Sequence, residues 1–284
     1  MSKAASGFAA IAPRMCCSPR NFFRTLLGVL VAGAVTVAGR AQTSAAISLS
    51  GFTHDIVVTS GAVTNSYIPT LNVEFYEQGA DLSGLGFGSP SQGLPVGGSF
   101  LSEANNAIGF QLAPYGSANS LVLLDTESTN MTLVSAGSFQ DLHFLATAQG
   151  GLGASMAITL HFTDSSTTAV PTFSAISDWT DTSDGYAVAA RDMGVVGTGV
   201  GGVYSDALFL KEFDYVLSGA DQAKTLDYFT VAYTTSNGPL MFFGASGTAI
   251  PEPALMRRSP GWPRWAWSRC VAGAERISRA APRH

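Results

Sequence analysis

Residues 155–162, Ser-Met-Ala-Ile-Thr-Leu-His-Phe, decide the fold class of this chain. Met, Ile, Leu and Phe alternate with Ser, Ala, Thr and His, which gives one apolar face and one mostly polar face. This period of two residues is typical of a half-buried β-strand. Residues 142–147, Leu-His-Phe-Leu-Ala-Thr, precede it across the glycine-rich segment 149–153. The two apolar segments therefore predict a β-hairpin.

A second pair of strands is expected further along the chain. Residues 228–233 alternate in the same way, and residues 240–243, Leu-Met-Phe-Phe, follow the turn-forming cluster Ser-Asn-Gly-Pro at 236–239. These segments predict a second hairpin that closes the domain. Further strands are expected at residues 46–58, 62–76, 108–112, 120–125, 131–135, 169–175 and 206–217.

This spacing of short strands predicts an all-β protein. Because no long helical period interrupts the strands, we expect an antiparallel two-sheet β-sandwich of the jelly-roll type. A single domain over residues 45–249 is favoured. The glycine-rich stretch 82–98 is the best candidate for a long loop within it.

The charge distribution narrows the classes of partner. Residues 41–254 carry 19 Asp and Glu against three basic residues, Arg191, Lys211 and Lys224. Such an acidic region disfavours nucleic acid as a partner and suits a protein that stays soluble outside the cell or collects divalent cations. The three cysteines are at positions 16, 17 and 270, so neither disulfides nor a thiolate zinc site are expected to stabilise this region.

The N-terminal segment has the pattern of a secretory signal. Arg20 and Arg24 precede an apolar run at residues 26–38, followed by Gly39-Arg40-Ala41, a small-x-small cleavage pattern. We interpret residues 1–41 as a signal peptide and expect a secreted protein. Since a start at Met15 would give a signal of more ordinary length, Met15 is an alternative initiation site.

A sorting motif is expected at the other end of the domain. Residues 250–254 read Ile-Pro-Glu-Pro-Ala, and the motif Pro251, Glu252 and Pro253 directly follows the last expected strand. This arrangement resembles the PEP-CTERM sorting signal of secreted bacterial proteins. The resemblance implies cleavage by an exosortase-type processing enzyme and release to the cell surface or the exopolysaccharide matrix.

Residues 255–284 depart from that family. Where a membrane helix should follow, the chain has seven arginines and three prolines, so this tail cannot form a stable membrane span. We expect it to be a disordered basic tail, read out of frame. The alternative is a basic aromatic tail that contacts nucleic acid or membrane, which Trp262, Trp265 and Trp267 would favour.

The second half of the domain has a further resemblance. Residues 138–248 resemble the galactose-binding-like jelly-roll modules attached to glycoside-active enzymes. The resemblance implies a non-catalytic module that holds carbohydrate. The segments that carry it are 138–147, 157–164, Ser177-Asp178-Trp179 and 220–226.

The loop after residue 176 provides the candidate ligand-binding residues. Trp179 and Tyr186 offer flat apolar faces for sugar C–H groups, and Arg191 offers paired donors for hydroxyls or a carboxylate. The alternative is a solvated loop in which Trp179 is buried as a core anchor.

The same loop carries three acidic residues at regular spacing. No cofactor is expected apart from Ca²⁺, for which Asp178, Asp181 and Asp184 could supply hard oxygen donors. His143 and His161 lie on the two strands of the first expected hairpin. We interpret them as ordinary strand residues on a solvated face, because no third metal ligand stands at clear spacing from them.

No catalytic motif is present in the sequence. A nucleophile elbow, a His-Glu-x-x-His pair and a phosphate-binding loop are all absent. The leading hypothesis is therefore a non-catalytic protein of the cell surface or extracellular matrix, with carbohydrate binding as a secondary hypothesis. The alternatives are a secreted carbohydrate-active enzyme with hidden carboxylates and an inert structural scaffold.

Overall fold

The computed structural model describes most of the expected domain. It covers residues 43–60, 68–85, 87–150, 153–197, 202–235 and 238–250. The expected signal peptide, the motif at 251–253 and the basic tail lie outside the described residues. Within the described part of the chain, no helix has both the length and the apolar character needed to cross a membrane.

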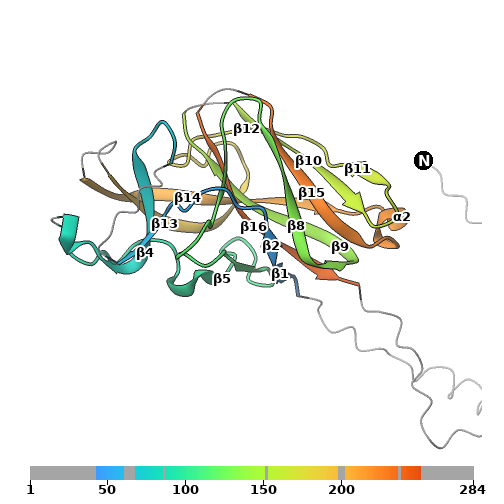
Figure 1. Cartoon of the computed structure of the whole chain (residues 1–284), viewed down its shortest axis with the longest axis horizontal. Coiled ribbons are helices and arrows are strands. Elements are labelled where there is room, and N and C mark those ends of the chain that lie inside the picture. The colour runs from blue at the N-terminus through green and yellow to red at the C-terminus, as the bar shows by residue number, and fades with distance from the viewer. Residues whose placement is uncertain are drawn as a thin grey trace, which may run out of the picture. The chain divides into compact units, whose positions relative to one another are not determined.

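Two large β-sheets dominate the fold (Figure 1), which confirms the all-β, sandwich-like prediction. The larger sheet has the order β1 (Ala45–Ile47), β16 (Leu240–Ala249), β9 (Phe139–Ala148), β14 (Gly202–Val216), β13 (Ala187–Gly197), β4 (Val73–Asp81) and β3 (Val57–Ser60), with β7 (Leu121–Leu123) also paired to β16. The smaller sheet has the order β11 (Thr167–Ala169), β10 (Ala154–Phe162), β15 (Leu226–Tyr233), β8 (Ser128–Gly137) and β2 (Leu49–Ser50), with β12 (Phe173–Ile176) also paired to β10.

Short elements complete the described structure. They are the separate two-stranded sheet of β5 (Ser99–Leu101) and β6 (Gly109–Gln111), the 3₁₀ turns η1 (Ser83–Leu85) and η2 (Val96–Gly98), and the single α-helical turn α2 (Gly219–Gln222).

Both predicted hairpins are wrong in their pairing. The strands exist, but β9 and β16 belong to the larger sheet whereas β10 and β15 belong to the smaller one. The loops that join β9 to β10 and β15 to β16 therefore carry the chain from one sheet to the other. Burial gives the physical reason. Residues 142–148 are all buried, so β9 is covered on both faces, whereas burial alternates strictly along β10.

The main core fills the space between the two sheets. Phe144 of β9 packs edge-on against Phe229 of β15, with ring centroids 5.4 Å apart, and Phe229 packs in turn against Phe242 of β16 at 5.8 Å. Met156, Ile158, Leu160 and Phe162 of β10 join the same cluster. The alternating stretch that predicted the fold thus supplies one wall of this core.

A second core covers the opposite face of the larger sheet. Phe75 of β4 packs edge-on against Phe243 of β16 and against Trp179, with ring centroids 5.4 and 5.7 Å apart. Leu145 of β9 belongs to this cluster while its neighbour Phe144 belongs to the first. The larger sheet is therefore buried on both faces in its centre, and Figure 1 shows it extending through β13 and β4 beyond the smaller sheet.

Several predicted strand boundaries are corrected. The expected strand 46–58 is broken into β1, β2 and the start of β3, with Gly51 at a φ of 111° between them. β13 was not predicted, and its register with β14 shifts three times. The fold is also not wholly antiparallel, because β3 pairs with β4 in parallel. The specific jelly-roll assignment stays a prediction.

Gly194 of β13 provides a test of this packing. A Cβ at this position would lie 1.9 Å from the hydroxyl of the fully buried Tyr76. Because the ring is held in the core, we expect Gly194→Ala to lower the free energy of unfolding by about 1–3 kcal/mol. Urea denaturation measures the change. Gly116→Ala is the control, because nothing lies within 4 Å of the Cβ added there.

Candidate functional site

The loop between β12 and β13 carries the three aspartates expected to bind calcium. Asp178 accepts hydrogen bonds from the backbone N–H and hydroxyl of Thr180, at 3.0 and 2.8 Å. Asp181 accepts the equivalent pair from Ser183, at 2.8 and 2.7 Å. Asp184 instead faces the protein interior, with 1% of its side chain exposed. The structure therefore does not bring these three carboxylates together as a ligand set.

Asp184 belongs to a buried ion pair that sequence reasoning missed. Its Oδ2 accepts a hydrogen bond from Lys211 Nζ at 2.5 Å, and Lys211 is fully buried. The ammonium also donates to the backbone oxygen and the hydroxyl of Ser177, at 2.8 and 2.6 Å. Burial alone would raise the pKa of Asp184, but hydrogen bonds from Lys211 and Ser177 outweigh it and lower that pKa. This arrangement anchors the loop to β14.

The two aromatic residues expected to contact sugar are engaged in packing. Trp179 is 7% exposed within the second core, so the alternative of a core anchor describes it. Tyr186 is partly buried, its ring centroid lies 4.7 Å from that of Phe213, and its hydroxyl donates to the backbone oxygen of Ser174 at 2.8 Å. Trp179 therefore offers no open stacking surface, whereas the expectation for Tyr186 stays a prediction.

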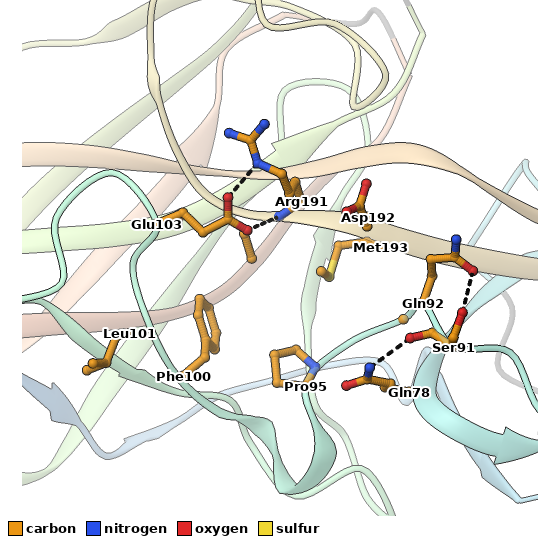
Figure 2. A pocket seen from close by; sticks show the side chains of 13 residues that line it. Gln78, Ser91, Gln92, Pro95, Phe100, Leu101, Glu103, Arg191, Asp192 and Met193 are labelled. Carbon is orange, nitrogen blue, oxygen red and sulfur yellow. Dashed lines mark hydrogen bonds and ion pairs between the residues drawn. The ribbon is translucent and has the colours of Figure 1, made fainter.

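Arg191, by contrast, lines a surface hollow of about 330 Å³ (Figure 2). Its Nε forms an ion pair with Glu103, and its backbone N–H donates to the other carboxylate oxygen of Glu103 at 3.1 Å. The two terminal nitrogens of the guanidinium make no hydrogen bond with the described residues. The hollow is lined by Gln78, Ser91, Gln92, Gly93, Pro95, Phe100, Leu101, Glu103, Ala189, Ala190, Arg191, Asp192 and Met193.

The hollow combines apolar and planar polar groups. Phe100 is partly exposed and stacks on Phe110, with ring centroids 5.6 Å apart. Gln78 at the opposite side donates to the backbone oxygen of Ser91 at 2.7 Å. Asp192 is exposed at a φ of 58°, next to one of the register shifts of β13. Sequence reasoning missed this hollow because most of its wall comes from the segment 78–103, which was expected to be largely loop.

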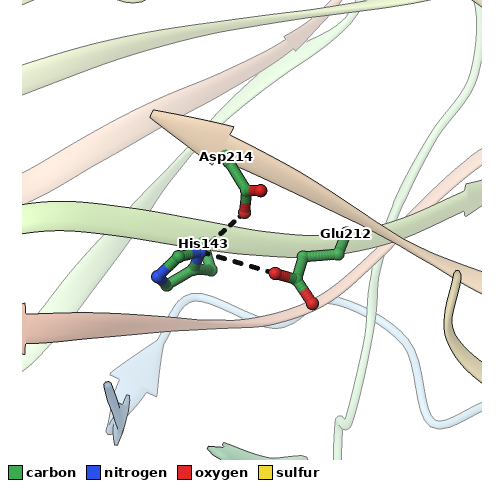
Figure 3. A group of neighbouring side chains, drawn as sticks. All are labelled: His143, Glu212 and Asp214. Carbon is green, nitrogen blue, oxygen red and sulfur yellow. Dashed lines mark hydrogen bonds and ion pairs between the residues drawn. The ribbon is translucent and has the colours of Figure 1, made fainter. Parts of the chain in front are cut away.

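A second cluster gathers around His143 on β9 (Figure 3). Its Nδ1 lies 2.6 Å from Oδ1 of Asp214 and 3.5 Å from Oε1 of Glu212, both on the neighbouring strand β14. Asp214 stands directly opposite His143 in the strand register, which explains the close contact. Within the described ranges, this is the one group of three His, Cys, Asp or Glu side chains with ligand atoms all within 4.8 Å of one another.

The other ring nitrogen of His143 is also held. Nε2 lies 3.0 Å from the hydroxyl of Ser44 and 3.3 Å from Oδ1 of Asp141. Thr248 supports both partners, since its hydroxyl lies 2.7 Å from that of Ser44 and its backbone N–H donates to Asp141 at 3.1 Å. His143 is thus buried, which corrects the expectation of a solvated face, and it lies on a different sheet from His161.

The surroundings of His143 shift its titration. Burial alone would lower the pKa of the imidazole, but hydrogen bonds with Asp214 and Glu212 outweigh burial and raise the pKa to about 9. The cluster had a signal in the sequence. Glu212 and Asp214 are two residues apart in an expected strand and therefore share one face of it.

No family model matches the chain, and no curated protein matches it significantly.

Proposed function

We propose that the protein is a secreted, non-catalytic component of the cell surface or extracellular matrix that binds carbohydrate in the hollow beside Arg191. The observation that carries the proposal is the set of groups in that hollow. Arg191 and Glu103 present a fixed donor and acceptor pair at its rim, next to the partly exposed ring of Phe100.

Each of these groups suits a sugar. Adjacent hydroxyls on a pyranose ring match a guanidinium and a carboxylate that already hold each other in position, because little conformational entropy remains to be lost. An apolar ring next to them accepts the C–H face of the sugar, as in pockets that combine apolar walls with a few placed polar groups. Gln78 and Gln92 add amide donors and acceptors to the wall.

The proposed location follows from the ends of the chain. A basic and apolar N-terminal segment precedes an acidic, cysteine-free region, and Pro251, Glu252 and Pro253 follow the last strand. We therefore propose export and handling by an exosortase-type processing enzyme, with extracellular polysaccharide as the partner.

A glycan array with the purified protein tests the binding site. We expect wild type to bind a subset of glycans and Arg191→Ala to weaken that binding at least tenfold in isothermal titration calorimetry. The loss of a charged hydrogen-bonding group, about 1.5–3 kcal/mol, gives that magnitude. Lys224→Ala removes the same charge from the turn between α2 and β15 and should leave affinity unchanged.

Three outcomes contradict the proposal. If the folded wild-type protein binds no glycan on the array, the result favours an inert scaffold. Binding that survives Arg191→Ala places the site elsewhere on the protein. Turnover of any bound glycan, measured as release of reducing ends, favours the enzyme alternative.

A further inference from the structure

The cluster around His143 has more negative charge than the described residues neutralise. The carboxylates of Asp141, Glu212 and Asp214 all contact the one imidazole. The described residues include three Lys and Arg, and each is paired elsewhere: Arg191 with Glu103, Lys211 with Asp184 and Lys224 with Asp221. Even with a protonated His143, three carboxylates face a single positive charge.

The charge of Glu212 is the hardest to account for. Its side chain is 1% exposed, and its Oε2 is buried without a hydrogen-bond partner. Its Oε1 faces the His143 ring, whereas Oε2 points away from it (Figure 3). A buried carboxylate with an orphan oxygen is costly unless a cation or a donor reaches it. The buried, unneutralised charge of the Glu212 carboxylate therefore also points to a positively charged ligand.

The three donor atoms of this cluster all lie within 4.8 Å of one another. In a tetrahedral zinc site, ligand atoms at 2.0–2.2 Å from the metal lie about 3.4 Å from one another. Nδ1 of His143 and Oε1 of Glu212 are already 3.5 Å apart. Nδ1 and Oδ1 of Asp214 are 2.6 Å apart, so this hydrogen bond must open by less than 1 Å to admit an ion.

The far side of the ring has the arrangement that metal-binding histidines need. A ligating imidazole donates its other N–H to a carboxylate or an oxygen, which fixes its tautomer and its orientation. Here Nε2 lies 3.0 Å from the Ser44 hydroxyl and 3.3 Å from Asp141 Oδ1, so Nδ1 can face the ion as a free lone pair. The cluster reaches solvent through Asp214, because 57% of that side chain is exposed.

We propose that His143 Nδ1, Glu212 Oε1 and Asp214 Oδ1 form a site for one divalent transition-metal ion of the Zn²⁺ class. One imidazole nitrogen with two carboxylate oxygens suits Zn²⁺ better than Ca²⁺, which prefers six to eight oxygen ligands. Three protein ligands leave a fourth position for water. The ion would link β9 to β14, because His143 lies on one strand and both carboxylates lie on the other.

Titration of the full-length, metal-stripped protein with Zn²⁺ tests the site. Thiols are first blocked with N-ethylmaleimide, since the chain contains Cys16, Cys17 and Cys270. We expect calorimetry to give one Zn²⁺ per chain. Asp214→Asn should weaken binding at least tenfold and His143→Gln at least a hundredfold, while His161→Gln, on the other sheet, should have no effect.

A second readout separates the site from a folding defect. In wild type, Zn²⁺ should raise the melting temperature. Asp214→Asn should remain folded without metal, because Asp214 is exposed, and should lose that increase. Failure of the folded wild type to bind Zn²⁺ overturns the proposal and leaves His143 as a buried imidazolium. Equal binding by His143→Gln also overturns it, because the ion then binds elsewhere.

Discussion

Asp184→Ala is expected to lower the free energy of unfolding by about 3–5 kcal/mol. The substitution leaves the Lys211 ammonium fully buried with no counter-charge, bonded to neutral oxygens of Ser177 and the Asp178 backbone. A buried charge without its partner is among the costliest single changes a domain can undergo. The loss should appear as a lower urea midpoint with an unchanged slope.

Two variants make this result specific. Asp184→Ala combined with Lys211→Met should recover much of the lost stability, because the double variant no longer buries a charge. Asp181→Ala removes a partly exposed carboxylate that forms no ion pair with another described residue from the same loop, and it should have a far smaller effect. A double variant less stable than Asp184→Ala would contradict the ion-pair explanation.

The sign of the pH dependence follows from the same pair. Because the pKa of Asp184 is lowered in the folded protein, its stabilising contribution is present above the pKa of the unfolded carboxyl, about 3.9. The contribution disappears as the pH falls through the lower folded value. Acid unfolding of wild type and Asp184→Ala should therefore converge at low pH.

The sequence was sufficient to predict most of the strands, though not β13, and it did not predict their partners. The alternation along 155–162 indicates that one face of β10 is buried. The same alternation would occur whichever strand lay beside β10, so it does not identify the partner. Pairing β9 with β10 required that a short glycine-rich segment form a tight turn, yet the same segment also spans the distance between two sheets. The mostly apolar stretch 142–148 was the available sign in the sequence that β9 lies in a doubly covered sheet, and the structure shows all seven residues buried.

The candidate sites show the same limit. Arg191 was predicted from its residue type, but the hollow it lines depends on residues 78–103, which are distant in sequence. The contact between His143 and Asp214 spans 71 positions and requires the register of β9 against β14. Spacing along one strand indicates which side chains share a face. To predict which side chains on different strands lie close together, the order of the strands in the sheet must also be known.

Trp179→Ala is the second substitution with a large expected effect. It also distinguishes a residue of the core from a residue that stacks on sugar. Trp179 is 7% exposed and packs edge-on against Phe75 in the second core. Removing the indole leaves a cavity beneath the larger sheet, and such truncations cost about 3–5 kcal/mol. We expect urea denaturation to show this loss, and Trp179→Phe to retain much of the stability by keeping an aromatic contact with Phe75.

Glycan binding by the Trp179→Ala variant tests where on the protein carbohydrate binds. Under conditions in which Trp179→Ala remains folded, its affinity for carbohydrate should equal that of wild type, since Trp179 does not line the hollow beside Arg191. Arg191→Ala should show the opposite pattern, weak binding with near wild-type stability, because its side chain is 54% exposed. A fully folded Trp179→Ala variant that loses binding would indicate that the ligand binds at the 177–186 loop, and it would refute the assignment to the hollow.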